Sequence, residues 1–145
     1  MFTTTNSWLF WALLSAFFAA LTAVFAKIGI RGVDSDLATL IRASIILIVL
    51  ALLVWRGNKW GGLHSISSKS WLFLTLSALT TGASWTCYFR ALKLGEAFKV
   101  APVDKLSVIL VALFGFLFLG ERPSGIEWFA VSLVTGGVVL LVFKR

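Results

Sequence analysis

The stretch Trp8–Ala26, WLFWALLSAFFAALTAVFA, runs for 19 residues without a charged side chain. A hydrocarbon core about 30 Å thick is crossed by roughly 20 apolar residues in a helix, so this stretch predicts a membrane span. Trp71–Phe89 is a second uncharged stretch of the same length. Residues 1–7 contain no Lys or Arg, which favours a membrane span over a cleaved signal peptide for the first stretch.

Three shorter uncharged stretches reach spanning length by including polar or charged residues at their ends. The predicted spans are residues 8–26, 37–55, 70–92, 100–120 and 124–143. Runs such as Ile45–Val54, IILIVLALLV, lack the alternation of transmembrane strands. Helices, in contrast, satisfy their own backbone in lipid. The sequence therefore predicts an all-α membrane protein, a bundle of five transmembrane helices in one domain over residues 1–145.

The composition excludes an ordinary soluble domain. Hydrophobic residues make up 59% of the chain and charged residues 13%, against about 25% charged residues in typical soluble domains. A net charge of +7 in a soluble protein would indicate nucleic-acid binding. Here the basic residues cluster at the ends of the spans, so we expect the lipid bilayer as partner and no nucleic acid.

The distribution of Lys and Arg between alternating connections predicts the orientation. One side carries nine of them, namely Lys27, Arg31, Arg42, Arg90, Lys93, Lys99, Lys105, Lys144 and Arg145. The other side carries Arg56, Lys59, Lys69 and Arg122. This bias places the N-terminus outside and the C-terminus in the cytoplasm. Without Arg42, Arg90 and Lys105, which lie within helix ends, the bias is six against four.

Ionisable residues within spans are candidates for function, because a charge in the membrane costs several kcal/mol. The candidates for a polar substrate path are Arg42, Trp85, Tyr88, Arg90, Asp104, Lys105 and Ser107, and Glu121 is a candidate for coupling or gating. The structural alternative is snorkelling of the basic side chains toward headgroups. For Trp85, in the middle of the third span, the alternatives are packing between helices and lining the path.

Two local expectations concern the fourth span. Consecutive helical residues point about 100° apart, so Asp104 and Lys105 are expected to pair with other helices and not with each other. Pro102 is expected in the first turn of the helix, where a missing N–H does no harm. The sequence shows no metal-ligand cluster, no catalytic triad and no phosphate-binding loop. We therefore expect no enzyme activity, no metal and no cofactor.

Motifs at the helix ends resemble the drug/metabolite transporter superfamily, in particular its EamA-type group and the small five-span prokaryotic branch. The motifs are Lys27–Ile30 (KIGI), Asp34–Asp36 (DSD), Ala38–Arg42 (ATLIR), Ser84–Gly95 (SWTCYFRALKLG), Val103–Val108 (VDKLSV) and Leu119–Arg122 (LGER). The resemblance covers nearly the whole chain. It implies a multi-pass protein of the prokaryotic cytoplasmic (inner) membrane that moves a small organic metabolite, often as an exporter.

The resemblance also bears on assembly and substrate. Larger relatives carry two five-helix units in inverted orientation, so a single unit is expected to be half of an inverted-repeat transporter. It would pair as an antiparallel homodimer or with a similar unit. The four-helix small multidrug-resistance relatives use a glutamate in their first helix, whereas residues 8–26 hold no carboxylate. This departure argues against proton-coupled cation export, and a net basic path would suit an anionic or zwitterionic metabolite. The alternative function is a membrane partner subunit that transports nothing itself.

Overall fold

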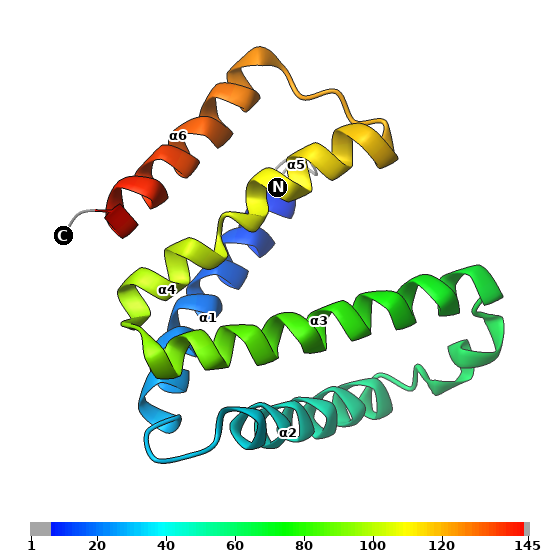
Figure 1. Ribbon diagram of the computed structural model, residues 1–145. Helices are drawn as coiled ribbons and strands as arrows, with labels where there is room; N and C mark the ends of the chain where they lie inside the picture. The colour runs from blue at the N-terminus through cyan, green and yellow to red at the C-terminus, as the bar shows by residue number, and fades with distance from the viewer. Residues whose placement is uncertain (1–6, 144–145) are drawn as a thin grey trace. The chain divides into compact units, whose positions relative to one another are not determined.

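The computed structural model describes residues 7–143, with side chains from 8 to 142. Its elements are α1 (Ser7–Gly29), α2 (Ser35–Arg56), the 3-10 turn η2 (Trp60–Ser65), α3 (Ser68–Leu94), α4 (Ala97–Asp104), α5 (Ser107–Phe114), the π-helical turn η3 (Gly115–Leu119) and α6 (Gly125–Phe143) (Figure 1). No strand occurs within residues 7–143. The prediction of an all-α protein is confirmed for this range.

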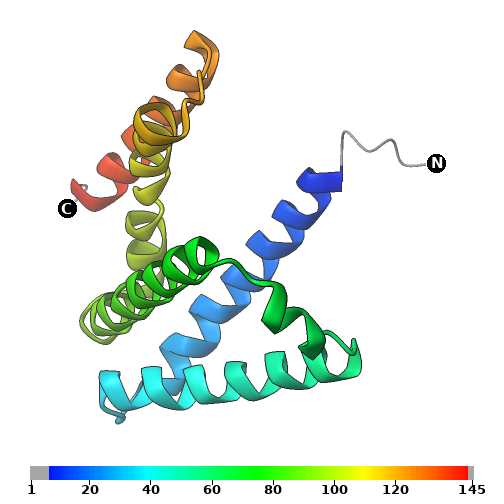
Figure 2. The same cartoon turned by 90° about the vertical axis from the view of Figure 1, so that its right-hand side faces the viewer.

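The chain forms two compact units, and the first ends at Leu94. In this unit α2 and α3 run side by side in opposite directions, joined by η2 (Figure 1). The N-terminal part of α1 diverges from α2, and the two helices come together where residues 30–34 connect them (Figure 2). The three helices therefore share one end.

This shared end holds the core of the first unit, and we call it the packed end. Its buried residues are Ala23, Ile30, Ser35, Phe89 and Leu92. Leu92 is fully buried, with 0% of its surface exposed. The Lys27 ammonium on α1 donates a hydrogen bond of 2.5 Å to the Leu92 carbonyl at the last turn of α3. A cation at that position also complements the negative end of the helix dipole.

The start of α2 is fixed by Asp34, which lies just outside the helix. Its carboxylate accepts hydrogen bonds from the backbone N–H groups of Asp36, at 2.9 Å, and Leu37, at 3.1 Å. These are the contacts of a helix N-cap, which satisfies N–H groups that have no partner within the helix. The bonds from Leu37 and then Asp36 hold the pKa of the Asp34 carboxyl below its ordinary value.

The second unit begins at Gly95 and contains α4, α5, η3 and α6. The fourth predicted span, residues 100–120, corresponds to the apolar segment Ala97–Leu119. The expectation of one unbroken helix there is wrong, because turn residues Lys105 and Leu106 separate α4 from α5. The expectation for Pro102 is also wrong, since α4 begins at Ala97 and Pro102 lies inside it. Proline supplies no N–H for the bond to the fourth preceding carbonyl. The helix accordingly tightens just after it, with Lys105 N–H bonded to the Pro102 carbonyl at 3.0 Å.

The connection between η3 and α6 is fixed at both of its ends. Gly120 ends the π-helical turn in the left-handed region at φ +69°, a conformation that favours glycine. Ser124 and Glu127 then form a reciprocal cap at the start of α6. The Glu127 carboxylate accepts the Ser124 N–H at 2.6 Å, and the Glu127 N–H donates to the Ser124 hydroxyl at 3.4 Å.

Four segments of residues 7–143 are long and apolar enough to cross a membrane, judged by length and composition. They are Trp8–Gly29, Ser35–Arg56, Ala97–Leu119 and Gly125–Val142. The predicted third span, residues 70–92, falls in α3, which has 27 residues and ample length. It is not among the four apolar segments. A count of five spans therefore stays a prediction.

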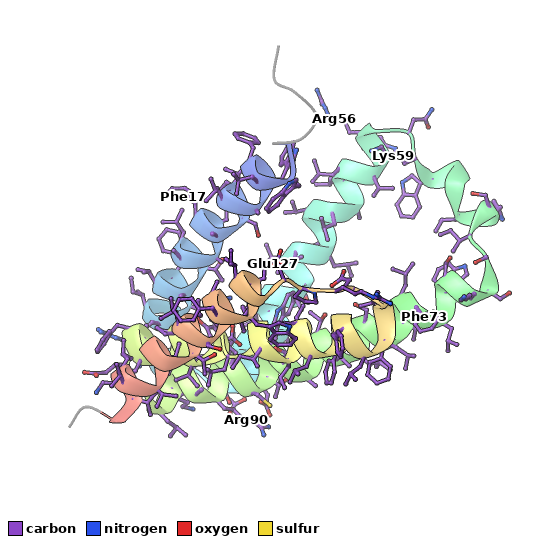
Figure 3. The ribbon with its side chains drawn as sticks, turned by 90° about the horizontal axis from the view of Figure 1, so that it is seen from above. Phe17, Arg56, Lys59, Phe73, Arg90 and Glu127 are labelled. Carbon is purple, nitrogen blue, oxygen red and sulfur yellow. The ribbon has the colours of Figure 1, made fainter. Side chains whose placement is uncertain are left out.

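The surface of the helices is that of a protein in lipid. Large apolar side chains are exposed along α1, α2, α3 and α6, for example Phe17 (58%), Leu47 (69%) and Leu140 (73%). Phe17 points away from its helix toward the outside in Figure 3. Soluble monomers rarely expose continuous apolar surface of this extent. Apolar surface of this extent is the kind that contacts lipid or other membrane helices.

Candidate substrate-binding site

The first unit places two cavities on two different faces of α2. Ala38, Ile41 and Arg42 face the first cavity, together with residues of α1 and Phe89 of α3. Asp36, Thr39 and Ala43 face the second cavity, which lies against α3. Each set follows the spacing of three and four residues that places side chains on one face of a helix.

Arg42 is the charged residue of the first cavity, which we call the Arg42 cavity. The cavity has a volume of about 480 Å³ and is otherwise lined mainly by apolar residues, such as Phe25 and Ile45. The Arg42 side chain is half-buried. Among residues 7–143, no carboxylate lies within ion-pair distance of its guanidinium.

Two aromatic rings of α3 support the Arg42 guanidinium. Its central carbon lies 4.6 Å from the centre of the Trp85 ring and 5.4 Å from that of Phe89. Trp85 and Phe89 are four residues apart on α3 and so present their rings on one face. Contacts of a cation with ring faces contribute about 0.5–2 kcal/mol each, with the larger values away from water. Trp85 thus packs between helices and also lines the second cavity.

Arg90 is fixed by a carboxylate of the neighbouring helix. Its Nη2 and Nε donate to the two carboxylate oxygens of Asp36 at 2.8 and 3.2 Å. This two-point geometry is the strong form of an arginine–carboxylate pair. Arg90 lies near the packed end, whereas Arg56 and Lys59 lie at the other end of α2 (Figure 3). Half-buried Tyr88 has its ring centre 6.4 Å from that of Phe89.

The second cavity lies between α2 and α3 and has a volume of about 680 Å³. Its lining includes four hydroxyl side chains, so we call it the hydroxyl groove. These hydroxyls belong to Thr39, Ser77, Thr81 and Thr86. Polar residues of α3 on this face are one reason why α3 is less apolar than the other long helices.

In the second unit, Asp104 and Lys105 form an ion pair with each other, at 3.4 Å. The expectation that they pair only with other helices is wrong, because the helix ends between them and the angle of 100° no longer applies. Ser107 begins α5, immediately after this turn. Both charged side chains therefore belong to the junction between α4 and α5.

Glu121, the candidate for coupling, lies next to η3. Its N–H bonds to the Gly115 carbonyl at 3.1 Å, and its carboxylate folds over the Gly115 backbone, where a Cβ atom would collide with Oε2. Gly115 is buried. Glycine at position 115 thus makes room for the Glu121 side chain.

Sequence reasoning did not include two residues of this site. In the sequence, Asp36 stands only as part of a helix-end motif and Phe89 only as a span residue. In the structure, Asp36 binds Arg90 and Phe89 supports Arg42. The spacing of Trp85 and Phe89 was a signal for the aromatic pair. The Asp36–Arg90 pair joins residues 54 apart and had no local signal.

Residues 6–143 match the model of the EamA-like transporter family. The chain belongs to this family. A Sinorhizobium protein described as an uncharacterized transporter in the cobO 3' region is 56% identical over 137 residues, which cover 94% of this chain and 97% of the relative. These matches confirm the predicted family and the predicted transporter function, and they establish a multi-pass integral membrane protein.

Other relatives of this EamA-family chain differ in length and description. A probable 4-amino-4-deoxy-L-arabinose-phosphoundecaprenol flippase subunit ArnE of Pseudomonas fluorescens is 33% identical, over 60% of this chain and 74% of the relative. An uncharacterized transporter of Bacillus subtilis, YxxF, is 21% identical over 97% of this chain but 44% of its own length. No solved structure matches the chain significantly.

Proposed function

We propose that this EamA-family protein exports a small organic metabolite across the cytoplasmic membrane and holds a negative group of that metabolite at Arg42. The observation that carries the proposal is the placement of Arg42 in an otherwise mainly apolar cavity, over two aromatic rings and without a carboxylate partner within residues 7–143. An anion or zwitterion would supply the missing partner.

The cost of a charge in lipid supports this role. An arginine at the centre of a span costs about 2.5–3.5 kcal/mol or more. Arg42 lies in the first half of α2, where the cost is smaller but still favours compensation within the protein. The rings of Trp85 and Phe89 compensate part of this cost. They interact with the face of the guanidinium and leave N–H groups at its edge. A carboxylate or phosphate accepts two such N–H groups with good geometry.

The other candidate cations are already paired. Arg90 is bound to Asp36 and Lys105 to Asp104, so each pair is close to neutral. Arg42 therefore provides the positive charge for binding, and Arg90 has a positioning role between α2 and α3. The mainly apolar lining of the Arg42 cavity favours an organic group next to the negative one.

Proteoliposomes with purified protein would test this proposal, with a set of radiolabelled organic anions, zwitterions and cations. Arg42→Gln removes the charge and keeps similar volume, and we expect it to lower anion flux about tenfold or more. Loss of one hydrogen bond to a charged group, of about 1.5–3 kcal/mol, is sufficient for this. Arg42→Lys should retain part of the flux. Arg56→Gln, at the far end of α2, is the control. Unchanged flux in Arg42→Gln would remove Arg42 from the mechanism.

We further propose that two copies pair in antiparallel orientation. The chain covers 44% of the Bacillus subtilis relative and 33% of a Vibrio cholerae relative, so those proteins have room for two such units. Within such a fused chain, an odd number of spans inverts the second unit, as inverted-repeat transporters require. Two separate copies reach the same symmetry only if they insert in opposite orientations. Reporters active on only one side of the membrane, fused to the C-terminus, should give signals on both sides. A signal from one side alone would exclude the antiparallel homodimer.

A second candidate function is a partner subunit in a hetero-pair, and the description of the ArnE relative as a flippase subunit favours it. In that case the protein alone would carry no substrate. Flux that appears only after a second EamA-family chain is added would decide for the hetero-pair. Flux with the purified protein alone would decide against it.

A further inference from the structure

The hydroxyl groove between α2 and α3 differs chemically from the Arg42 cavity. Its lining contains Ser77, Thr81 and Thr86 of α3 and Thr39 of α2, with Asp36 at one end. The α3 residues of the lining, from Leu74 to Thr86, recur at intervals of three and four along the helix, so together they form one broad face. Hydroxyl side chains of a membrane helix can hydrogen-bond to groups outside their own helix.

The hydroxyls of this groove are arranged to accept hydrogen bonds. Thr39 donates to the Ser35 carbonyl at 2.8 Å, Thr81 to the Ser77 carbonyl at 2.8 Å, and Thr86 to the Gly82 carbonyl at 3.0 Å. Each donor is thus used within its own helix, and the oxygen lone pairs remain available. The Ser77 hydroxyl has no hydrogen bond within residues 7–143 and can donate to a ligand.

The charge and the space of the groove narrow the class of ligand. The Asp36 carboxylate is neutralised by Arg90, so it offers oxygen acceptors without a free negative charge. Small residues Ala78 and Gly82 keep the α3 side open, and a Cβ atom built on Gly82 meets nothing within 4 Å. The Trp85 ring adds a flat apolar wall. An aromatic wall with several oxygen acceptors suits the alternating C–H and O–H groups of a sugar-like ring.

We propose that the hydroxyl groove binds an uncharged polyhydroxylated group, such as a sugar ring, of the transported molecule. The proposal deepens the proposed function, since Arg42 contacts the Trp85 ring that lines this groove. The negative group of the substrate would lie at Arg42 and its hydroxylated part against α3. The groove would bind neutral hydroxyl groups of a ligand, so its ligand binding can be tested with an uncharged compound.

Cysteine labelling in nanodiscs, which leave both membrane faces accessible, tests whether the groove is open to water. The single Cys87 is first replaced by Ser, and Thr81→Cys is compared with Leu79→Cys. Leu79 is on the same helix, is 66% exposed and does not line the groove. We expect a water-soluble maleimide to label Thr81→Cys at least tenfold faster, because a cysteine in lipid stays in its unreactive thiol form and out of reach of the reagent. Equal rates would overturn the proposal, since the groove would then be filled by lipid or by another helix.

Protection by defined probes tests the ligand class. Methyl glucoside should slow the labelling of Thr81→Cys severalfold, whereas inorganic phosphate and tetramethylammonium should not. Gly82→Leu should fill the groove and abolish protection, and the matched control Ala83→Leu, one position further on α3 and outside the groove lining, should retain it. Size-exclusion profiles and helical circular dichroism confirm that each variant is folded.

Three outcomes would overturn the assignment. Protection by phosphate would make the groove an anion site, protection by tetramethylammonium would make it a cation site, and absence of protection by methyl glucoside would exclude the sugar-like class. The failure of the proposed function is separate, because it would be seen as unchanged anion flux in Arg42→Gln. Glucoside protection in that variant would leave the groove assignment intact.

Discussion

The packed end of the first unit and the remaining length of α2 and α3, which lines the Arg42 cavity and the hydroxyl groove, differ in how their polar residues are paired. At the packed end, Asp34, Asp36, Arg90 and Lys27 each bind a defined partner, and buried Leu92 lies among them. Along the remaining length, Arg42 has no carboxylate partner within residues 7–143. Paired polar groups fix the helices relative to one another, and polar groups with unused capacity can bind a substrate.

The largest expected effect is on the packing of this end. Leu92→Ala should lower the free energy of unfolding by about 2 kcal/mol or more, because it leaves a cavity at a fully buried position. Leu94→Ala is the matched control, since Leu94 is 90% exposed in the same helical turn and should cost little. Unfolding of purified protein in mixed micelles measures both. Similar losses in the two variants would contradict a core at this end.

A smaller effect is expected for the Asp36–Arg90 pair, because the two side chains are 56% and 59% exposed. Asp36→Asn and Arg90→Gln should each lower the melting temperature by less than Leu92→Ala. The double variant should be no worse than the more affected single variant, since each substitution removes the same interaction. Melting in nanodiscs at low and high salt provides the measurement. Strict additivity would show that the two residues act independently.

The smallest effect concerns the Asp34 cap and depends on pH. Bonds from Leu37 and Asp36 lower the pKa of Asp34 in the folded protein below the ordinary 3.8. The contribution of its charge is therefore present above that value and lost as the pH falls through the folded pKa. Asp34→Asn keeps an oxygen acceptor but does not titrate. The stability difference between the two proteins should begin to shrink near the ordinary value of 3.8 and shrink further as the pH falls through the lower folded pKa, as thermal unfolding would show. A constant difference would contradict a role for the Asp34 charge.

How much of the site the sequence predicts depends on how far apart the interacting residues are along the chain. The helices and the apolar surfaces follow from local composition, so four of the five predicted spans correspond to apolar helical segments of the structure. Arg42 was identifiable because a charge within an apolar run is exceptional. Its support by Trp85 and Phe89 depends on the register of α2 against α3, which local composition does not specify.

The fourth predicted helix shows the limit of local reasoning. Its apolar composition is continuous, yet Pro102 lies inside α4 and the helix ends two residues later. The expectation that Asp104 and Lys105 pair with other helices assumed an unbroken helix. It is wrong because the helix ends at Asp104. A difference of a few residues in where a helix begins changes which side chains can meet, because each residue turns the helix by about 100°.

The sequence by itself determined that this is a helical membrane protein of the EamA family, because hydropathy and helix-end motifs are local properties. Only the tertiary structure decided which polar residues pair with another residue of the protein and which are left to bind a substrate. That division depends on contacts such as Arg90 with Asp36, 54 residues apart. The stretch Trp8–Ala26 predicted a span, and the structure adds that its C-terminal part helps to line the cavity of Arg42.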